Sequence, residues 1–330
     1  MKLLQILTTI ALFFLTISGH RHFSEDHHWN NWKHTYGKHY SITTEEQYRY
    51  ETFLENKHYI AHRQPHVSHS LNLNEFADIG REEWSSRFTK SDKQSNIQWQ
   101  PIPQPPVISL EVDWRDPNKN PEHMVAVNPV KNQQQCGSCW AFSTIASVET
   151  RWAIAKKQLV SLSEQELVDC STSFGNNGCN GGLMDQAFQY IIANGGVCSE
   201  QSYPYTAADG TCQSSTCKSL ATISNYNDVQ PMNETQLLFA SLGGTVSIAI
   251  EADSQDFQFY SGGVFNSPNC GTNLDHGVAI VGFGHDSQSG LDYWIVRNSW
   301  GPSWGEQGYI RIVRGQNMCG LAQVPSYPIV

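Results

Sequence analysis

The distribution of cysteine constrains this 330-residue chain more than any other feature of its sequence. All nine cysteines lie after Gln135, whereas ten of the thirteen histidines lie between His20 and His69. The odd number means that at least one thiol stays free even if every other cysteine forms a disulfide. Eight cysteines can pair in about 105 ways, so counting predicts a cross-linked C-terminal body without giving its connectivity.

The N-terminus indicates where such disulfides would form. A mostly apolar run over residues 3–17 follows Met1 and Lys2 and ends in small residues. This pattern is typical of a secretory signal peptide, which we assign to residues 1–19, and it is shorter than the roughly 20 residues of a membrane-spanning helix. We therefore expect passage through an oxidising compartment. A formal net charge of -10 argues against nucleic acid and anionic membranes as partners.

A proline-rich stretch over residues 101–106 (PIPQPP) separates the cysteine-free region from the cysteine-rich body and predicts an extended linker. Before it, Trp29, Trp32 and Tyr36 recur at helical spacing. A second helical pattern follows in Glu45, Arg49, Phe53, Asn56 and Ile60. Ordinary core packing accounts for such stripes in an isolated segment. In front of a secreted, disulfide-rich body, however, a cysteine-free helical unit suggests a removable pro-region.

The body changes its apolar period along the chain. Residues 140–159 and 182–193 have helical spacing, and Ser163 with Glu166 predicts a capping box for a short helix between them. Further on, strand-like runs begin at Thr245, Gly277, Leu291 and Gly308. The sequence therefore predicts an α+β body with a helical lobe, a β lobe and a ligand cleft between them.

Cys139 is the candidate nucleophile. It follows a Gly-Ser turn and precedes a predicted helix, and the partial positive charge of a helix N-terminus lowers the pKa of a thiol. Cys136 and Cys139 also form a CxxC pair, which occurs in redox and zinc sites. Neither a second CxxC nor a spaced HxxxH, as a zinc site would have, follows this pair in the sequence, and the short βαβ context of a redox domain is missing around it. The nucleophile is favoured, and the two alternatives stay open on the CxxC alone.

His276 and Asn298 lie at the ends of two strand-like runs joined by the turn HDSQSG. Antiparallel pairing about a centre near Ser287 makes them cross-strand neighbours to within two residues. Such neighbours lie about 5 Å apart, which suits an amide oxygen that orients an imidazole beside a nucleophile. Taken singly, each residue is more often structural. Together with Cys139 they favour a catalytic site.

Four motifs, CGSCWAFS, GCNGGLMDQAF, LDHGVAIVGFG and NSWGPSWGEQGYIRI, occur in this order. With them the chain resembles a papain-like cysteine peptidase of the cathepsin L type. The resemblance implies a two-lobed papain-like fold, with a helical left lobe, a β-barrel-like right lobe and the active site between them. It also implies an inhibitory propeptide over residues 20–107 and a mature peptidase over residues 108–330. The helical lobe would span about 118–220 and the β lobe about 221–320.

The resemblance also assigns roles to individual residues. Cys139 resembles the nucleophile, His276 the general base and acid, and Asn298 the residue that orients the imidazole. Gln133 resembles the side-chain donor of the oxyanion hole, and Trp300 would shield the His276–Asn298 hydrogen bond from water. No metal and no organic cofactor are implied. The family pattern implies disulfides Cys136–Cys179, Cys170–Cys212 and Cys270–Cys319, and we expect Cys198 and Cys217, which lie outside that pattern, to pair with each other.

Substrate preference is expected to lie in the pocket for the residue second before the scissile bond. Its walls resemble Leu183, Met184, Ala249, Leu274, Gly277 and Val324, while Gly182 would bind the peptide backbone. These side chains are apolar, so Phe, Leu or Val is expected there. The segment from Ser171 is too short for a histidine-bearing occluding loop, which favours an endopeptidase. The expected partners are protein and peptide substrates and cystatin-type inhibitors, and the expected state is a monomer.

The first region resembles the inhibitory propeptide of this family. Glu45, Arg49, Phe53, Asn56 and Ile60 match most of one propeptide motif, although Gln64 stands where an Asn is usual. The resemblance implies that the chain after Phe88 crosses the cleft in reverse until it is removed, at acidic pH. The clustered histidines gain charge near pH 6.5 and suggest a pH trigger, while a solvated polar face is an equal alternative. The expected destination is a lysosome, a digestive vacuole or the extracellular space.

Overall fold

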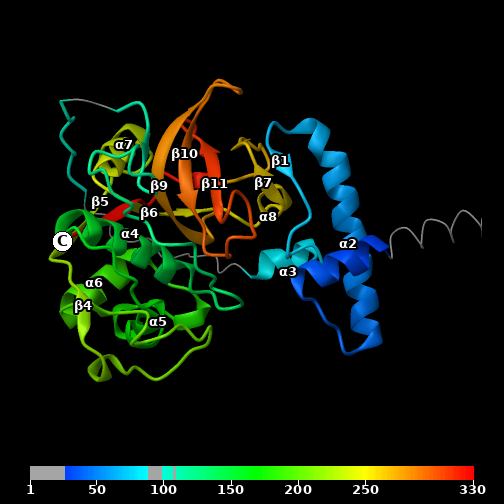
Figure 1. Ribbon diagram of the computed structural model, residues 1–330, viewed down its shortest axis with the longest axis horizontal. Coiled ribbons are helices and arrows are strands. Elements are labelled where there is room, and N and C mark those ends of the chain that lie inside the picture. Colours follow the sequence, from blue (N-terminus) through cyan, green and yellow to red (C-terminus); the bar gives the residue numbers. More distant parts are fainter. Residues whose placement is uncertain (1–26, 88–98, 107–108) are drawn as a thin grey trace, which may run out of the picture.

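A computed structural model describes residues 27–87, 99–106 and 109–330 (Figure 1). The predicted signal peptide and the segment directly after Phe88 lie outside these residues. Within them, no helix combines the length and the apolar character needed to cross a bilayer.

The propeptide is helical, as predicted, and it packs around aromatic side chains. Trp29 and Trp32 stack at 5.1 Å, and Phe53 is fully buried against both. Phe259, from the mature body, completes this core. The propeptide elements are a helix over residues 27–36, α2 (Thr43–Arg63), η1 (Gln64–His66), β1 (Ser70–Leu71) and α3 (Arg81–Ser86).

The helical lobe packs around α4 (Cys139–Lys156), which is buried along most of its length. The helix begins at Cys139, and it ends before the predicted residue 159 because Lys157 adopts a left-handed conformation with φ 57°. The other elements of this lobe are α5 (Glu164–Cys170), η2 (Thr172–Phe174), η3 (Gly178–Asn180), α6 (Met184–Asn194), β3 (Val197–Cys198), η4 (Ser214–Thr216) and β4 (Ser219–Ala221).

The β lobe is built on an eight-stranded sheet with the order β5-β12-β6-β9-β10-β11-β8, and β2 pairs with β9. The contact between β11 and β8 is parallel and the other pairs are antiparallel. Its elements are β2 (Val112–Asp113), β5 (Asn225–Asp228), α7 (Glu234–Leu242), β6 (Val246–Ile250), α8 (Gln255–Gln258), β7 (Tyr260–Gly262), β8 (Val264–Phe265), β9 (His276–Asp286), β10 (Leu291–Arg297), β11 (Tyr309–Val313), η5 (Met318–Gly320) and β12 (Ser326–Ile329).

The propeptide docks on the β lobe, beside β7 and α8 (Figure 1). Strand β1 pairs antiparallel with β7, so the propeptide adds a strand to the body. In α3, Trp84 is buried and donates its indole N–H to the carbonyl of Ala252 at 3.2 Å. These contacts of the described propeptide residues hold the lobe that carries His276.

Two local predictions need correction. Ser163 accepts the backbone N–H of Glu166 at 3.0 Å, but the Glu166 carboxylate does not complete a capping box. It accepts hydrogen bonds from Tyr190, Asn194 and the backbone of Cys198 instead. The N–H of Ser163 already donates to the carbonyl of Cys198, which removes the partner that a capping box requires.

The β9–β10 hairpin forms, but in a different register from the one predicted. Leu291 lies opposite Asp286, so residues 287–290 form the turn, and the register shifts again between Ile295 and Val296. The predicted centre at Ser287 was therefore too early, and a bulge displaces the strand end. His276 and Asn298 are offset along the hairpin rather than directly opposite each other.

Candidate active site

The start of α4 and the start of β9 approach each other closely at Gly277. A Cβ atom at Gly277 would lie 3.1 Å from the backbone of Trp140, so only glycine permits this contact without movement. Gly277 follows His276 directly, and Trp140 follows Cys139. The contact therefore brings the imidazole and the thiol, which belong to different lobes, to the same cavity.

His276 is held by two neighbours. Its Nε2 lies 2.8 Å from Oδ1 of Asn298, which also accepts the backbone N–H of Ser299 at 2.8 Å. Because Oδ1 can only accept, Nε2 carries the hydrogen, and Nδ1 is left as the basic nitrogen. Trp300 stacks on the imidazole with ring centroids 4.8 Å apart. The offset hairpin still delivers the predicted pair, and Trp300 covers it.

Gln133 is buried beside the start of α4. Its Nε2 donates to the carbonyl of Cys136 at 3.0 Å, and its Oε1 accepts from the hydroxyl of Ser299 at 2.6 Å. Nε2 carries a second hydrogen, so this amide can also donate to an oxygen in the cavity that Gln133 and Cys139 both line. This geometry is compatible with an oxyanion hole.

Burial of Cys139 acts against the predicted lowering of its pKa. Burial raises the pKa of the Cys139 thiol to about 11, although backbone N–H groups of Gly277 and Trp140 act in the opposite direction. Burial also lowers the pKa of His276 to about 4, against the effect of Asn298. The helix N-terminus is present, but removal of water outweighs it. With the propeptide docked, burial therefore favours the uncharged forms of both the thiol and the imidazole.

The propeptide contributes to the walls of this site. A cavity of about 660 Å³ is lined by Cys139, His276 and Trp300 together with propeptide residues that include Phe76 and Trp84. The rings of Trp84 and Trp300 meet edge to face at 5.1 Å. Trp300, which stacks on the imidazole, is therefore itself covered by Trp84 of α3.

Two of the predicted specificity residues share one core cluster. Met184 and Ala249 pack against the same core cluster of the helical lobe, and Ala249 lies opposite Gly277 in the sheet. Leu274 and Val324 lie outside this cluster, and both are half-buried. The remaining two predicted residues, Gly182 and Leu183, precede α6.

Gly182 allows a second close approach. A Cβ atom there would lie 2.7 Å from the ring of Trp140 and 2.5 Å from Oδ1 of Asn176. The segment before α6 therefore lies directly against the start of α4, where it can reach an extended peptide in the cleft.

Four disulfides cross-link the body, in the same pairs that the sequence analysis proposed. They are Cys136–Cys179, Cys170–Cys212, Cys198–Cys217 and Cys270–Cys319. In the part of the chain that the structure describes, Cys139 is the free cysteine. Of the two CxxC cysteines, Cys136 therefore belongs to a disulfide and Cys139 keeps its thiol.

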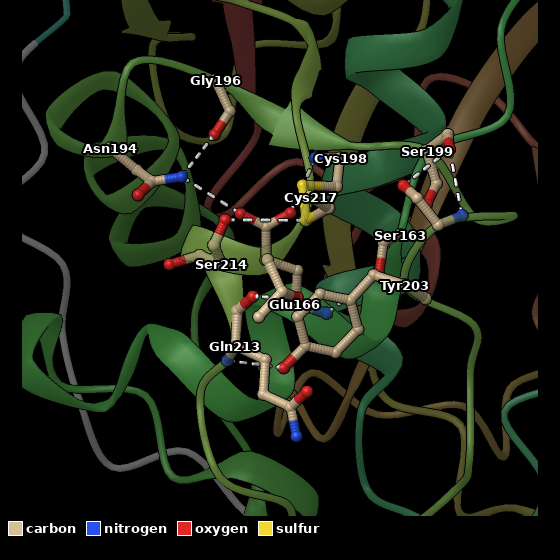
Figure 2. The surroundings of a disulfide bond; sticks show 12 residues. Ser163, Glu166, Asn194, Gly196, Cys198, Ser199, Tyr203, Gln213, Ser214 and Cys217 are labelled. Carbon is tan, nitrogen blue, oxygen red and sulfur yellow. Dashed lines mark hydrogen bonds between the residues drawn. A yellow bond between two sulfur atoms is a disulfide. The ribbon is translucent and has the colours of Figure 1, made fainter.

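One set of metal-binding residue types gathers elsewhere in the described residues: Glu166, Cys198 and Cys217 (Figure 2). The two sulfurs are bonded to each other, and the Glu166 carboxylate accepts the backbone N–H of Cys198 at 2.7 Å. To bind a metal ion, this cluster would need a thiolate sulfur and a free carboxylate oxygen as ligands. The cluster is therefore a structural clip, and it does not fit a metal in this state.

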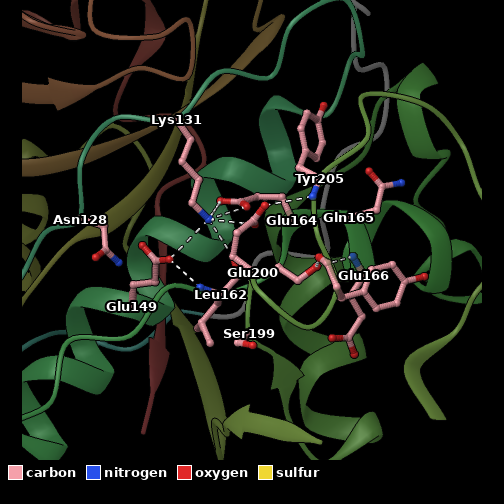
Figure 3. A network of polar contacts seen from close by, with 12 residues as sticks. Asn128, Lys131, Glu149, Leu162, Glu164, Gln165, Glu166, Ser199, Glu200 and Tyr205 are labelled. Carbon is pink, nitrogen blue, oxygen red and sulfur yellow. Dashed lines mark hydrogen bonds and ion pairs between the residues drawn. The ribbon is translucent and has the colours of Figure 1, made fainter. Parts of the chain in front are cut away.

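Sequence reasoning missed a buried charge network of the helical lobe (Figure 3). Lys131 donates to the Glu164 carboxylate at 2.7 Å and lies 3.2 Å from Glu200 and 3.8 Å from Glu149. Arg297 of β10 lies 3.9 Å from Glu149 of α4 and so extends the network across the two lobes. These residues are far apart in the sequence, and no local pattern marks them as partners.

Comparisons with known proteins agree with this geometry. The family model described as "Papain family cysteine protease" matches residues 108–329, and that described as "Cathepsin propeptide inhibitor domain (I29)" matches residues 29–84. A cathepsin L-like peptidase of Aedes aegypti is 41% identical over 350 aligned residues, with 100% of both chains covered. Cathepsin L of Sarcophaga peregrina is 44% identical over 320 residues, with 92% of each chain covered.

A solved structure covers both parts of the chain. Digestive procathepsin L 3 of the Tenebrio molitor larval midgut superposes with a TM-score of 0.83 at 40% sequence identity. The match covers 93% of this chain and 99% of that chain. The similarity therefore includes the propeptide as well as the two-lobed body.

Proposed function

The chain belongs to the papain family of cysteine proteases and carries the inhibitory propeptide of a zymogen, and from this premise we propose that it is an endopeptidase that acts through a thioester on Cys139. The observation that carries the proposal is the hydrogen bond of 2.8 Å between His276 Nε2 and Asn298 Oδ1, at an imidazole that lines the same cavity as Cys139. This bond fixes the hydrogen on Nε2 and makes Nδ1 the basic nitrogen that would exchange a proton with sulfur.

The chemistry follows from these groups. Once the propeptide has left, the sulfur attacks the peptide carbonyl carbon, and its proton passes to Nδ1 of His276 and then to the leaving amine. The oxygen of the tetrahedral intermediate takes hydrogen bonds from Gln133 Nε2 and the backbone N–H of Cys139. A water molecule then gives a proton to the imidazole and attacks the thioester. The acid product leaves, and the thiol is restored.

Replacement of the nucleophile tests the mechanism. We expect Cys139→Ser to abolish peptide hydrolysis and labelling by a peptidyl epoxide, with an unchanged melting temperature. Gln133→Ala is expected to lower kcat/KM by about 10² to 10³. Full peptidase activity in Cys139→Ser would overturn the assignment.

We further propose that the enzyme prefers apolar or aromatic residues second before the scissile bond. The support is the apolar character of Leu183, Met184, Ala249 and Val324. Val324→Glu is expected to admit arginine at that position, because a carboxylate would then face the guanidinium. Turnover by the unmodified enzyme that is equal for Arg and for Phe or Leu would contradict this pocket.

Release of the propeptide is proposed to occur at acidic pH, in a lysosome, a digestive vacuole or outside the cell. The mature enzyme is proposed to act as a monomer on protein and peptide substrates and to bind cystatin-type inhibitors. The docked propeptide supports the zymogen state, since Phe76 and Trp84 help to enclose the cavity of Cys139.

A further inference from the structure

Two tyrosines of the segment YPYT, Tyr203 and Tyr205, point to different places although one residue separates them. Both lie in the loop between Cys198 and Cys217, which a disulfide closes. The hydroxyl of Tyr203 donates to Asp169 at 2.7 Å, within the helical lobe. The hydroxyl of Tyr205 lies instead against the turn that precedes α4.

Hydrogen-bond accounting fixes the direction of each contact of Tyr205. The carbonyl oxygen of Gln133 lies 2.8 Å from the phenol and can only accept, so Tyr205 donates to it. Ser138 Oγ lies 2.7 Å from the same phenol oxygen and must therefore donate. Burial raises the pKa of Tyr205 to about 12, so the phenol keeps its proton at any pH at which the enzyme would act.

Ser138 occupies the N-cap position of α4, but its side chain does not cap the helix. A serine at this position ordinarily accepts a backbone N–H of the first turn. Its hydroxyl is turned to Tyr205 instead, and the N–H of Ala141 bonds the carbonyl of Ser138 at 2.8 Å, so the N–H groups of Cys139 and Trp140 are the ones that face the sulfur. Tyr205 thus affects both sides of the site: the carbonyl of Gln133 and the residue before Cys139.

Tyr205 is itself firmly held. Its ring meets Phe142 of α4 edge to face at 4.9 Å. Its backbone N–H donates to Glu200 at 3.0 Å, and Glu200 lies 3.2 Å from Lys131 (Figure 3). The phenol therefore has a defined position from which to align two chain segments.

We propose that Tyr205 is a positioning residue for the oxyanion hole: its hydroxyl ties together the segments that carry the two donors, the amide of Gln133 and the backbone N–H of Cys139. The inference rests on the proposed function, since it assumes that these two groups bind the oxyanion. It assigns a role to a side chain that touches neither the substrate nor the reacting atoms.

The direct test is Tyr205→Phe, made in the full-length zymogen and assayed after activation. Tyr203→Phe is the matched control in the same loop. Tyr205→Phe removes one hydroxyl, keeps the contact with Phe142 and leaves two polar groups without their partner. We expect kcat/KM to fall about tenfold through kcat, with KM nearly constant, because the lost alignment matters mainly in the transition state. Tyr203→Phe is expected to stay within about twofold of the unmodified enzyme.

A double-mutant cycle separates positioning from a general structural effect. If Tyr205 acts through Gln133, Tyr205→Phe causes no further loss in a Gln133→Ala background. The same tenfold loss in both backgrounds would overturn the inference. A peptide aldehyde, whose hemithioacetal oxygen enters the oxyanion hole, is expected to bind Tyr205→Phe more weakly in proportion to the fall in kcat/KM.

The outcomes are distinguishable from failure of the proposed function. Activity in Cys139→Ser removes the function, and full activity in Gln133→Ala removes the oxyanion role together with this inference. Full activity in Tyr205→Phe removes the inference alone. If Tyr205→Phe does not fold, Ser138→Ala provides the second route, and it must show the same loss in kcat and the same dependence on Gln133.

Discussion

Two regions of this molecule bury charge in different ways. The first is a permanent network inside the helical lobe that reaches the β lobe through the Arg297–Glu149 pair, and its charges are redundant. Lys131 meets Glu164, Glu149 and Glu200 (Figure 3). Arg297 adds a second cation near Glu149. Burial lowers the pKa of Lys131, but the three carboxylates outweigh it, so the lysine stays charged.

The interface between the propeptide and the β lobe must come apart, and its charges are few. Arg63 of α2 pairs with the fully buried Asp256 of α8 at 2.9 Å, and Tyr59 donates to the same carboxylate. Next to them His69 is completely buried, and neither of its ring nitrogens has a hydrogen-bond partner among the residues that the structure describes. Aromatic contacts supply the rest, as with Phe265 at 4.6 Å from His69.

The difference teaches how one fold can contain a permanent and a temporary contact. A network in which each charge has several partners keeps most of its stabilisation when one group titrates. A contact that depends on one ion pair and one neutral imidazole can be released by a small change in protonation. The following experiments test whether the Lys131 network and the contact between the propeptide and the β lobe differ in this way.

The largest effect is expected from Lys131→Met. Removing the shared cation leaves Glu164 buried among carboxylates, which typically costs about 3 to 5 kcal/mol of the free energy of unfolding. Burial already raises the pKa of Glu164 well above its ordinary value, and loss of Lys131 would raise it further. A carboxyl with a raised pKa in the folded state loses stability as pH rises above about 4.5, so the deficit should be greater at pH 7 than at pH 5.

Melting temperatures of the zymogen at the two pH values measure this effect. Lys119→Met is the matched control, since Lys119 and Glu111 form an exposed pair at 3.3 Å. It is expected to change stability by less than about 1 kcal/mol. An equal loss for the two lysines, or an equal loss at both pH values, would contradict the network.

A smaller effect, confined to docking, is expected from Arg63→Met. It leaves Asp256 buried without its cation until the propeptide lifts off, and should weaken docking by about 3 kcal/mol. Labelling of Cys139 by a peptidyl epoxide at pH 7 should accelerate by about two orders of magnitude, since every 1.4 kcal/mol is tenfold. Lys33→Met, which removes an ion pair with Glu46 inside the propeptide, is the control. Equal labelling rates in the two variants would show that the Arg63 pair does not hold the interface.

The smallest effect is a pH dependence carried by His69. Burial lowers its pKa to about 4, with Asp256 raising it and Arg63 lowering it. The released imidazole has a pKa near 6.5, so docking is at full strength above that pH and weakens as pH falls. The loss is about tenfold per pH unit between roughly 6.5 and 4. The other titratable ring against it is Tyr260, which stays neutral because burial raises its pKa.

His69→Phe should remove this dependence and slow activation at pH 5 by at least about tenfold, while activation at pH 7 changes little. His62→Phe, on the exposed side of α2, is the control. Among the described propeptide histidines His69 is the buried one, so the histidine cluster as a whole is not required. An identical pH profile for His69→Phe and the unmodified zymogen would remove the trigger and leave the protease assignment intact.

Much of the fold and part of the site could be predicted from sequence because they depend on local patterns. Apolar spacing locates α2, α4 and α6, and the Gly-Ser turn locates Cys139 at the start of α4. The odd cysteine count requires a free thiol. The hairpin around His276 also followed from alternation, although a four-residue turn and a bulge moved its register.

The sequence by itself determined which residue types the site contains and which helix or strand carries each of them. Only the tertiary structure decided that Lys131 lies among three glutamates, that Tyr205 rather than Tyr203 reaches the turn before α4, and that His69 is enclosed. It also reversed the expected pKa shift of Cys139. The physical reason is that desolvation and long-range pairing are properties of the closed space around a group, and that space is formed by segments far from it in the chain.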